Sequence, residues 1–310
     1  MSWLRRRIRD YLGIGRLPRI QRELDELKIL TGRLLLRQIE AADECSDLAD
    51  VEFRVYSQFG DDGIIQYLLR TLDIEPKTFI EFGVEDYREA NTRFLLALCN
   101  WKGLVIDGDR GLTDRIRKDD ICWQHDLSVD CSFVDCDNIN DIFTRNGFSG
   151  DLGLLSIDVD GNDYWIWEAI TCVNPALVVV EYNSVLGPDH AITIPYNPAF
   201  SRTAAHHSNL YWGASLGAFC RLAGKRGYSF VGSNSAGNNA YFVRNDKLGT
   251  RTAMSAKQGY VQSKYRESRD STGQLTFLSG DDRIKAIKDM PVVDLERDET
   301  VRIRELFDLA

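Results

Sequence analysis

Residues 79–86, which read FIEFGVED, decide the fold. The apolar run Thr78–Val84 predicts a short buried strand, and the carboxylate of Glu81 interrupts it near its end. Gly83 follows and lets the backbone approach a ligand closely. The carboxylate can accept hydrogen bonds from an ammonium group, although a charged strand end before a turn has the same pattern. A GxGxxG fingerprint is absent here, which disfavours a nicotinamide dinucleotide as the ligand.

Strand-like and helix-like segments alternate between residues 50 and 245. This alternation predicts βαβ units and a parallel sheet. The apolar run LVVV at residues 177–180 is typical of a strand that is buried on both faces. The strands predicted in this region are Thr78–Val84, Gly103–Ile106, Ile121–Trp123, Leu152–Ile157 and Ala176–Tyr182.

The pattern changes after a helix predicted at residues 212–226. Tyr228–Val231 and Asn239–Val243 are strand-like, and the segment between them is too short for a crossover helix. These two strands should therefore be antiparallel to each other. The predicted fold is α/β: a Rossmann-like, mostly parallel seven-stranded sheet with a terminal antiparallel pair, preceded by a helical extension. Such a sheet is typical of methyltransferases rather than of dinucleotide dehydrogenases.

Acidic residues follow the next two predicted strands, at the edge where open α/β sheets bind ligands. Asp107 and Asp109 follow the second strand, and either could bind ribose hydroxyls. Asp126 follows the third predicted strand and is a candidate for contacting an adenine amino group. His125, beside it, is expected to be a surface loop residue.

Three aspartates, Asp158, Asp160 and Asp163, follow the fourth strand, and Glu181 ends the fifth. Carboxylates this crowded need a positive neighbour. Mg²⁺ or Mn²⁺ held by Asp158, Asp160 and Glu181 would supply one, and so would a cationic sulfonium ligand. Asp163, or Asn162 before it, could instead cap the helix that follows.

The long connection at residues 184–211 contains three of the four histidines of the chain: His190, His206 and His207. Transfer of a group to a hydroxyl oxygen benefits from a base that titrates near neutral pH, which histidine does. His190 and His207 are the candidates for this base, and Asp158 is a further catalytic candidate. A lone histidine is also common as a structural or exposed residue.

Four stretches together resemble class I S-adenosylmethionine-dependent methyltransferases, and among these the FkbM-like proteins associated with sugar and surface-glycan biosynthesis. The stretches are YSQFGDDGII at 56–65, FIEFGVED at 79–86 followed by Asn91-Thr92, IDVDGND at 157–163 and VEYN at 180–183. The resemblance covers residues 50–245. One departure from the family pattern is that Val84, Glu85, Asp86 and Tyr87 follow Gly83, where further glycines are usual.

The resemblance implies S-adenosylmethionine as cofactor and O-methylation, often of a sugar hydroxyl, with Mg²⁺ in some members. It places Glu81 and Gly83 on the cofactor motif, Asp107 on the ribose acid and Asp158 on the motif at strand four. Gln58, Asp61 and Asn91 lie in or beside the resembling stretches, and we expect them to contact the cofactor as well.

Composition restricts the partners and the compartment. The net charge of −9 argues against nucleic-acid binding, because a polyanion repels an acidic surface. The seven cysteines form no CxxC pair, which indicates a reduced, cytoplasmic protein. We expect no signal peptide, because no apolar run follows the N-terminal arginines, and no membrane span, because no apolar stretch reaches about 18 residues.

Three regions are predicted: an N-terminal helical extension at 1–46, a methyltransferase domain at 47–245 and a polar extension at 246–310 that packs on the domain, with helices at 281–288 and 296–308. Within the first region, residues 1–22 are rich in arginine and could lie on an anionic membrane, at its inner face. Residues 19–40 are amphipathic and are expected to form a homo-oligomer with a second copy.

Two other classes of protein remain compatible with the sequence. Asp158-Val159-Asp160 is a DxD triplet, which glycosyltransferases use to bind the metal of a nucleotide sugar. A non-catalytic scaffold with a methyltransferase-like fold would retain the strands without the chemistry. The leading hypothesis is an O-methyltransferase that acts on a small-molecule or glycan acceptor, a precursor of the cell surface.

Overall fold

The structure is a computed structural model that describes residues 17–41, 45, 47–72 and 74–307. Residues 1–16, which make up most of the predicted membrane-contacting stretch, lie outside the described residues. Within the described ranges, no helix combines the length and the apolar character that crossing a membrane requires.

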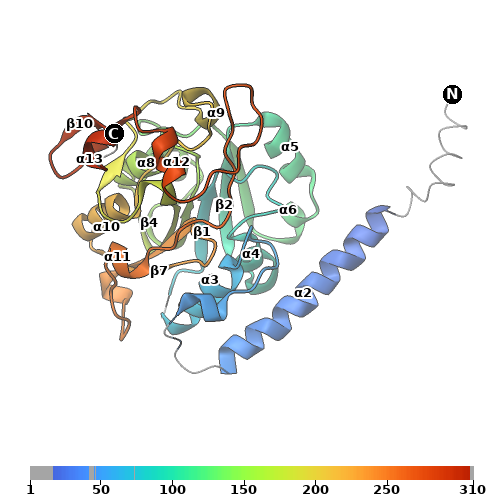
Figure 1. Cartoon of the computed structure of the whole chain (residues 1–310). Helices are drawn as coiled ribbons and strands as arrows, with labels where there is room; N and C mark the ends of the chain where they lie inside the picture. Colours follow the sequence, from blue (N-terminus) through green and yellow to red (C-terminus); the bar gives the residue numbers. More distant parts are fainter. Residues whose placement is uncertain (1–16, 42–44, 46, 73, 308–310) are drawn as a thin grey trace, which may run out of the picture.

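A seven-stranded sheet lies at the centre of the molecule, in the order β3-β2-β1-β4-β5-β8-β7 (Figure 1). The five strands from β1 to β5 run parallel, and β8 is antiparallel to both β5 and β7. This order, with one antiparallel strand beside β5, defines the Rossmann-like methyltransferase fold and confirms the predicted fold class. The strands are β1 (Thr78–Phe82), β2 (Lys102–Asp107), β3 (Leu127–Cys131), β4 (Gly150–Ile157), β5 (Val173–Glu181), β7 (Tyr228–Ser233) and β8 (Asn239–Arg244).

Helices cover both faces of this sheet, because alternate residues of each central strand point to opposite sides. Phe79 of β1 packs into the core on one face, and its neighbour Ile80 packs into the core on the other. The first face is covered by α3 (Asp61–Thr71), α4 (Arg93–Cys99), α5 (Arg110–Lys118) and α6 (Ile121–Gln124). The second face is covered by α7 (Ile139–Arg145), α8 (Asp163–Ala169) and α10 (Leu216–Lys225).

The third strand differs from its prediction. Residues 121–124 form the helical turn α6, and β3 begins only at Leu127. The helical turn has a short apolar run because Ile121 is buried against the core. In the sequence, such a run has the same pattern as a short strand. This shift moves Asp126 from the carboxyl end of the strand to its amino end.

A second, three-stranded sheet in the order β10-β9-β6 joins distant parts of the chain. It consists of β6 (Ile192–Thr193), β9 (Pro291–Asp294) and β10 (Glu299–Arg302), all antiparallel. The helix predicted at 296–308 is therefore wrong in its first half, where Val301 alternates with polar residues as strands do.

The remaining helices are α2 (Leu17–Ala41), α9 (Arg202–Ala205), α11 (Ala256–Gly259), α12 (Asp281–Ala286) and α13 (Ile303–Leu306), with short 3₁₀ turns at Leu48–Val51, Ser184–Leu186 and Asn245–Lys247.

A buried carboxylate fixes the chain that leads into the first helix of the domain. One oxygen of Asp62 accepts hydrogen bonds from the backbone N–H groups of Val55, Tyr56 and Ser57, at 2.7–2.8 Å, and from the Ser57 hydroxyl. Burial raises the pKa of Asp62 to about 6, and these four bonds oppose the shift. The segment before α3 is thus held by a side chain rather than by a sheet.

We expect Asp62→Ala to lower the free energy of unfolding by about 3 kcal/mol or more, because three buried N–H groups lose their acceptor. Urea denaturation measures this loss. The control is Asp114→Ala, which removes a carboxylate paired only with Arg117 on the surface and should cost about 0.5 kcal/mol or less. Equal losses in the two variants would contradict the role given to Asp62.

Candidate functional site

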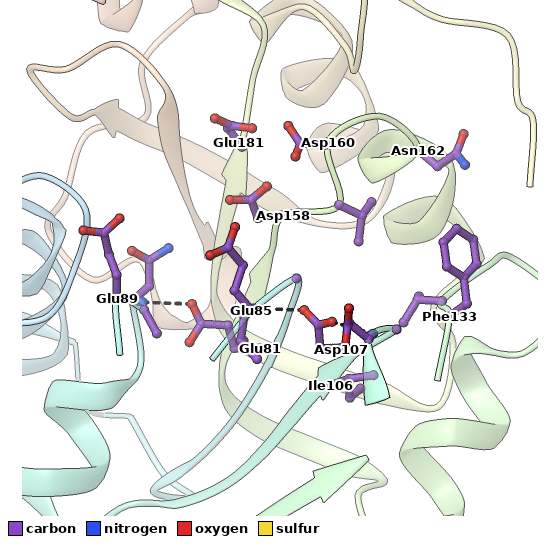
Figure 2. Close-up of a pocket in the computed structure, with 18 of the residues that line it drawn as sticks. Glu81, Glu85, Glu89, Ile106, Asp107, Phe133, Asp158, Asp160, Asn162 and Glu181 are labelled. Carbon is purple, nitrogen blue, oxygen red and sulfur yellow. Dashed lines mark hydrogen bonds between the residues drawn. The ribbon is translucent and has the colours of Figure 1, made fainter. Parts of the chain in front are cut away.

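A cavity of about 730 Å³ opens at the carboxyl ends of β1, β2, β4 and β5. Each of these four strands contributes a carboxylate there: Glu81, Asp107, Asp158 and Glu181 (Figure 2). Acidic residues far outnumber basic ones in the described lining, where Arg202 is the single basic residue. The cavity therefore favours a cationic ligand. The structure brings together most of the predicted site residues: Gln58, Glu81, Gly83, Asn91, Asp107, Asp109, Asp158, Asp160 and Glu181 all line this cavity.

Glu81 is buried and is already bonded within the protein. Its carboxylate accepts hydrogen bonds from the N–H groups of Asn91, at 2.8 Å, and Thr92, at 3.0 Å, and from the Thr92 hydroxyl. Burial raises the pKa of Glu81, and the bonds from Thr92 and Asn91 oppose this shift. Glu81 therefore ties the loop at 83–92 to the end of β1, and through that loop it shapes one wall of the cavity.

Gly83 is required by a close approach of two backbones. Its φ is +79°, and a Cβ built there would lie 1.5 Å from the carbonyl oxygen of Asp158. No side chain fits this space. Tyr87 also has a positive φ, of 60°, and its ring is fully buried, with its hydroxyl 3.0 Å from the Thr92 hydroxyl. Further glycines are usual at this turn in class I methyltransferases, whereas here Glu85 and Tyr87 adopt the left-handed conformation.

Asp107 connects the loops that follow β1 and β2. Its carboxylate accepts hydrogen bonds from the N–H of Glu85, at 2.9 Å, and from the N–H of Asp109, at 2.8 Å. Asp109 in turn caps α5, where one oxygen accepts from Gly111 and Leu112. Both acids face the cavity, and Asp107 is the one whose two oxygens lie at the junction of the two loops (Figure 2).

Asp158, Asp160 and Glu181 form a cluster of acids, the acid triad, at the other end of the cavity. Carboxylate oxygens of the three residues lie within 4.8 Å of one another, a spacing at which one cation could bind all three. Burial, followed by repulsion from the neighbouring carboxylates, raises the pKa of Asp158 and of Glu181 well above ordinary values. The arrangement fits a divalent cation, because Arg202 is one positive charge beside three carboxylates and such an ion would neutralise the remainder.

Asp163 holds the turn that carries Asp158 and Asp160 and is not part of the acid triad. It is fully buried, and its two oxygens accept hydrogen bonds from the N–H groups of Val159, at 2.8 Å, and Gly161, at 2.9 Å. Asp160, between them, has a positive φ of 55°. Asp163 therefore shapes the turn that presents Asp158 and Asp160, which is close to the capping role considered for it.

Arg202 is the site residue that the sequence reasoning missed. Its guanidinium lies 3.0 Å from an Asp160 oxygen, donates to the carbonyl of Asn209 at 2.9 Å and stacks on the ring of Trp212. The available signal was that Arg202 is the sole lysine or arginine between residues 184 and 211. It contacts the one member of the acid triad that is exposed.

Four predicted residues lie outside the described lining of the cavity. Asp126 is at the amino end of β3, where it pairs with Lys102 at 3.7 Å, so its adenine role is corrected. Asp61 is buried and accepts hydrogen bonds from Asn234, Asn239 and Tyr241, which makes it a support for the β7–β8 turn. His190 packs against Phe307, and His207 against His206, so neither is placed to act as the base.

The carboxyl end of β3 is occupied instead by an aromatic residue. Phe133 lines the cavity beside Gly108 and is 62% exposed. An apolar ring this open, next to Asp107, is suited to packing against a flat heterocycle. Phe133 thus lies at the strand end where the sequence had placed Asp126.

No family model matches the chain, and no curated protein matches it. Among solved structures, the N-terminal domain of EvdMO1 with SAH bound is 9% identical, with 68% of this chain and 94% of that chain covered and a TM-score of 0.39. A putative O-methyltransferase from Klebsiella pneumoniae is 12% identical, with coverages of 70% and 90% and a TM-score of 0.38. The plantazolicin methyltransferase BamL is 16% identical, with coverages of 55% and 64% and a TM-score of 0.34. At such low identities and TM-scores, the fold assignment rests on the strand order described above.

We expect Gly83→Ala to be far more destabilising than Gly147→Ala. Both glycines have a φ near +80°, but a Cβ at residue 147 meets nothing within 4 Å, whereas a Cβ at residue 83 overlaps the Asp158 carbonyl. Gly147→Ala should cost about 1 kcal/mol from backbone strain alone. Thermal denaturation of the two variants isolates the clash, and similar losses would contradict the close approach.

Proposed function

We propose that the protein is an S-adenosylmethionine-dependent O-methyltransferase whose acceptor is a sugar hydroxyl, in a cell-surface glycan or its precursor. The observation that carries this proposal is the acidic cavity at the carboxyl edge of a methyltransferase-type sheet. S-adenosylmethionine bears a sulfonium and an ammonium group, both cationic, and would supply the methyl group. The same proposal includes membership of the FkbM-like subfamily.

The residues present fit this cofactor. Gly83 lets the loop after β4 pack closely against the end of β1, and Asp107 offers acceptors for the ribose hydroxyls. Phe133 offers a ring for the adenine. Glu81 shapes the loop that surrounds the methionine end, because its own oxygens are bonded to Asn91 and Thr92.

The acid triad and its surroundings form the acceptor side of the proposed site. Asparagine side chains beside it could hydrogen-bond a hydroxyl-rich molecule: Asn162, Asn238 and Asn239 line this part of the cavity. The Oδ1 atom of Asn162 is buried and has no hydrogen-bond partner among the described residues, so it could accept one from the acceptor. This polarity supports a sugar rather than an apolar acceptor.

A divalent cation, when bound by Asp158, Asp160 and Glu181, would lower the pKa of an acceptor hydroxyl beside it. The described residues that line the cavity include no histidine, so the carboxylates of this cluster are the groups able to orient the hydroxyl or take its proton. Arg202 contacts Asp160 and would have to share or release that carboxylate when a cation binds. Holding donor and acceptor in one cavity supplies much of the rate of such a transfer.

Binding of S-adenosylmethionine, measured by calorimetry, tests the cofactor assignment. Asp107→Asn should weaken binding roughly tenfold or more, because a ribose hydroxyl loses a charged acceptor. Asp126→Asn is the matched control and should bind normally, since Asp126 lies at the opposite edge of the sheet. Binding of a UDP- or GDP-sugar without S-adenosylmethionine would instead favour the glycosyltransferase alternative, and binding of neither would favour the scaffold.

Thermal stability at two pH values tests the cation. Burial raises the pKa of Asp158 and Glu181 in the folded chain, so the folded state binds more protons than the unfolded state. Stability without metal should therefore fall as pH rises from about 5 to about 8. Added Mg²⁺ or Mn²⁺ should stabilise the protein more at the higher pH, because the ion requires ionised carboxylates.

Glu181→Gln should reduce both effects, whereas Asp137→Asn, an exposed acid away from the cavity, should change neither. If the metal shifts the melting temperature of Glu181→Gln as much as that of the wild type, the acid triad is not the metal site. Loss of turnover in EDTA and its recovery with Mg²⁺ or Mn²⁺ would extend the test to activity.

A further inference from the structure

Helix α2 has one apolar face that is fixed to the body of the molecule. Ile29 and Leu35 are partly buried against the core, and Ile39 is buried. Gly32 is buried too, and a Cβ there would lie 2.6 Å from Cε2 of Phe94 in α4. The second half of α2 is therefore anchored on α3 and α4.

A second apolar face of α2 is covered by none of the described residues. Five large residues on it are 47–62% exposed: Ile20, Leu24, Leu27, Leu30 and Leu34. Figure 1 shows the first half of this helix standing clear of the sheet and its helices. At about 100° per residue, this exposed stripe lies roughly 130° around the helix from the anchored one. The stripe cannot reach the body of its own chain without releasing the anchored face.

The spacing of the exposed stripe is that of a coiled-coil seam. Ile20, Leu27 and Leu34 recur every seven residues, and Leu24 and Thr31 lie between them. In heptad notation, Ile20, Leu27 and Leu34 occupy the positions called d. Leu24 and Thr31 occupy the positions called a. The seam spans roughly 21 Å at 1.5 Å per residue.

Charges beside the seam are complementary between two parallel copies. Glu23 occupies a g position and Lys28 the following e position, and g faces e of the partner in a parallel pair. Glu23 also pairs with Arg19 of its own helix at 2.8 Å, which leaves its carboxylate on the exposed surface. Symmetry would place a Glu23–Lys28 contact on both sides of the seam.

We propose that a second copy of this chain covers the exposed stripe, as a parallel two-stranded coiled coil over residues 20–34. A seam of two heptads is short for an isolated coil, but the anchored face holds each helix formed in advance. An anionic membrane is the less suitable occupant, since Glu23, Asp25 and Glu26 offset the three basic residues of this half of the helix and leave it without net positive charge. This inference is independent of methyl transfer.

Sedimentation equilibrium of the full chain tests the proposal, with a dimer expected for the wild type. Leu27→Asp combined with Leu34→Asp should produce a monomer with unchanged melting temperature of the domain. The matched control is Arg33→Asp, which alters net charge by the same two units at an exposed position away from the seam. A monomeric wild type, or a dimer that survives the double substitution, would overturn the proposal.

Charge reversal tests the parallel register. Glu23→Lys and Lys28→Glu should each weaken dimerisation roughly tenfold, because each replaces two attractions with two repulsions. The combination of both substitutions should restore the wild-type dissociation constant to within a few fold. Failure to restore it would overturn the parallel register. Co-sedimentation of a monomeric wild type with phosphatidylserine vesicles would assign the stripe to a membrane instead.

Discussion

The contact between Gly83 and the Asp158 carbonyl brings two loops of the sheet together, and the geometry of the cavity depends on it. Because β1 and β4 are neighbours, the loops that follow them must cross the same edge. A side chain at residue 83 would force them apart, and Glu81 and Asp158 would separate with them. The hydrogen bonds of Glu81 to residues 91 and 92, and of Asp107 to residue 85, then hold the first loop in this position.

Much of the fold could be predicted from the sequence because its central strands are buried on both faces. The run at 177–180 has no polar residue and admits few other interpretations. The third strand was misplaced, since Ile121 and its neighbours are apolar for a different reason, namely the packing of a helical turn. The link between β6 and β9 was missed because the paired residues lie about a hundred positions apart in the sequence, a separation that no local pattern reveals.

The candidate site was predictable at strand ends and unpredictable in the long connection. Glu81, Asp107, Asp158 and Glu181 meet because parallel strands end at one edge, so their positions follow from topology alone. The histidines at 190 and 207 follow no such rule, and tertiary packing directs them against other aromatic rings. Asp61 was predicted to contact the cofactor, but one of its oxygens accepts hydrogen bonds within the protein, as does one oxygen of its neighbour Asp62. Arg202 lies in the same connection as these histidines, but it lines the cavity, whereas His190 and His207 do not.

The three-stranded sheet has a consequence for the order in which the site is assembled. Arg202 lies on a connection that contains β6, and β6 pairs with β9, near the carboxyl end of the described chain. The strands that carry Glu81, Asp107 and Asp158 leave the ribosome much earlier. During synthesis, therefore, the half of the cavity built from β1, β2 and β4 can form before the connection with Arg202 is secured. The pairing of β6 with β9, which holds one end of this connection, can form only after residues 291–294 have emerged.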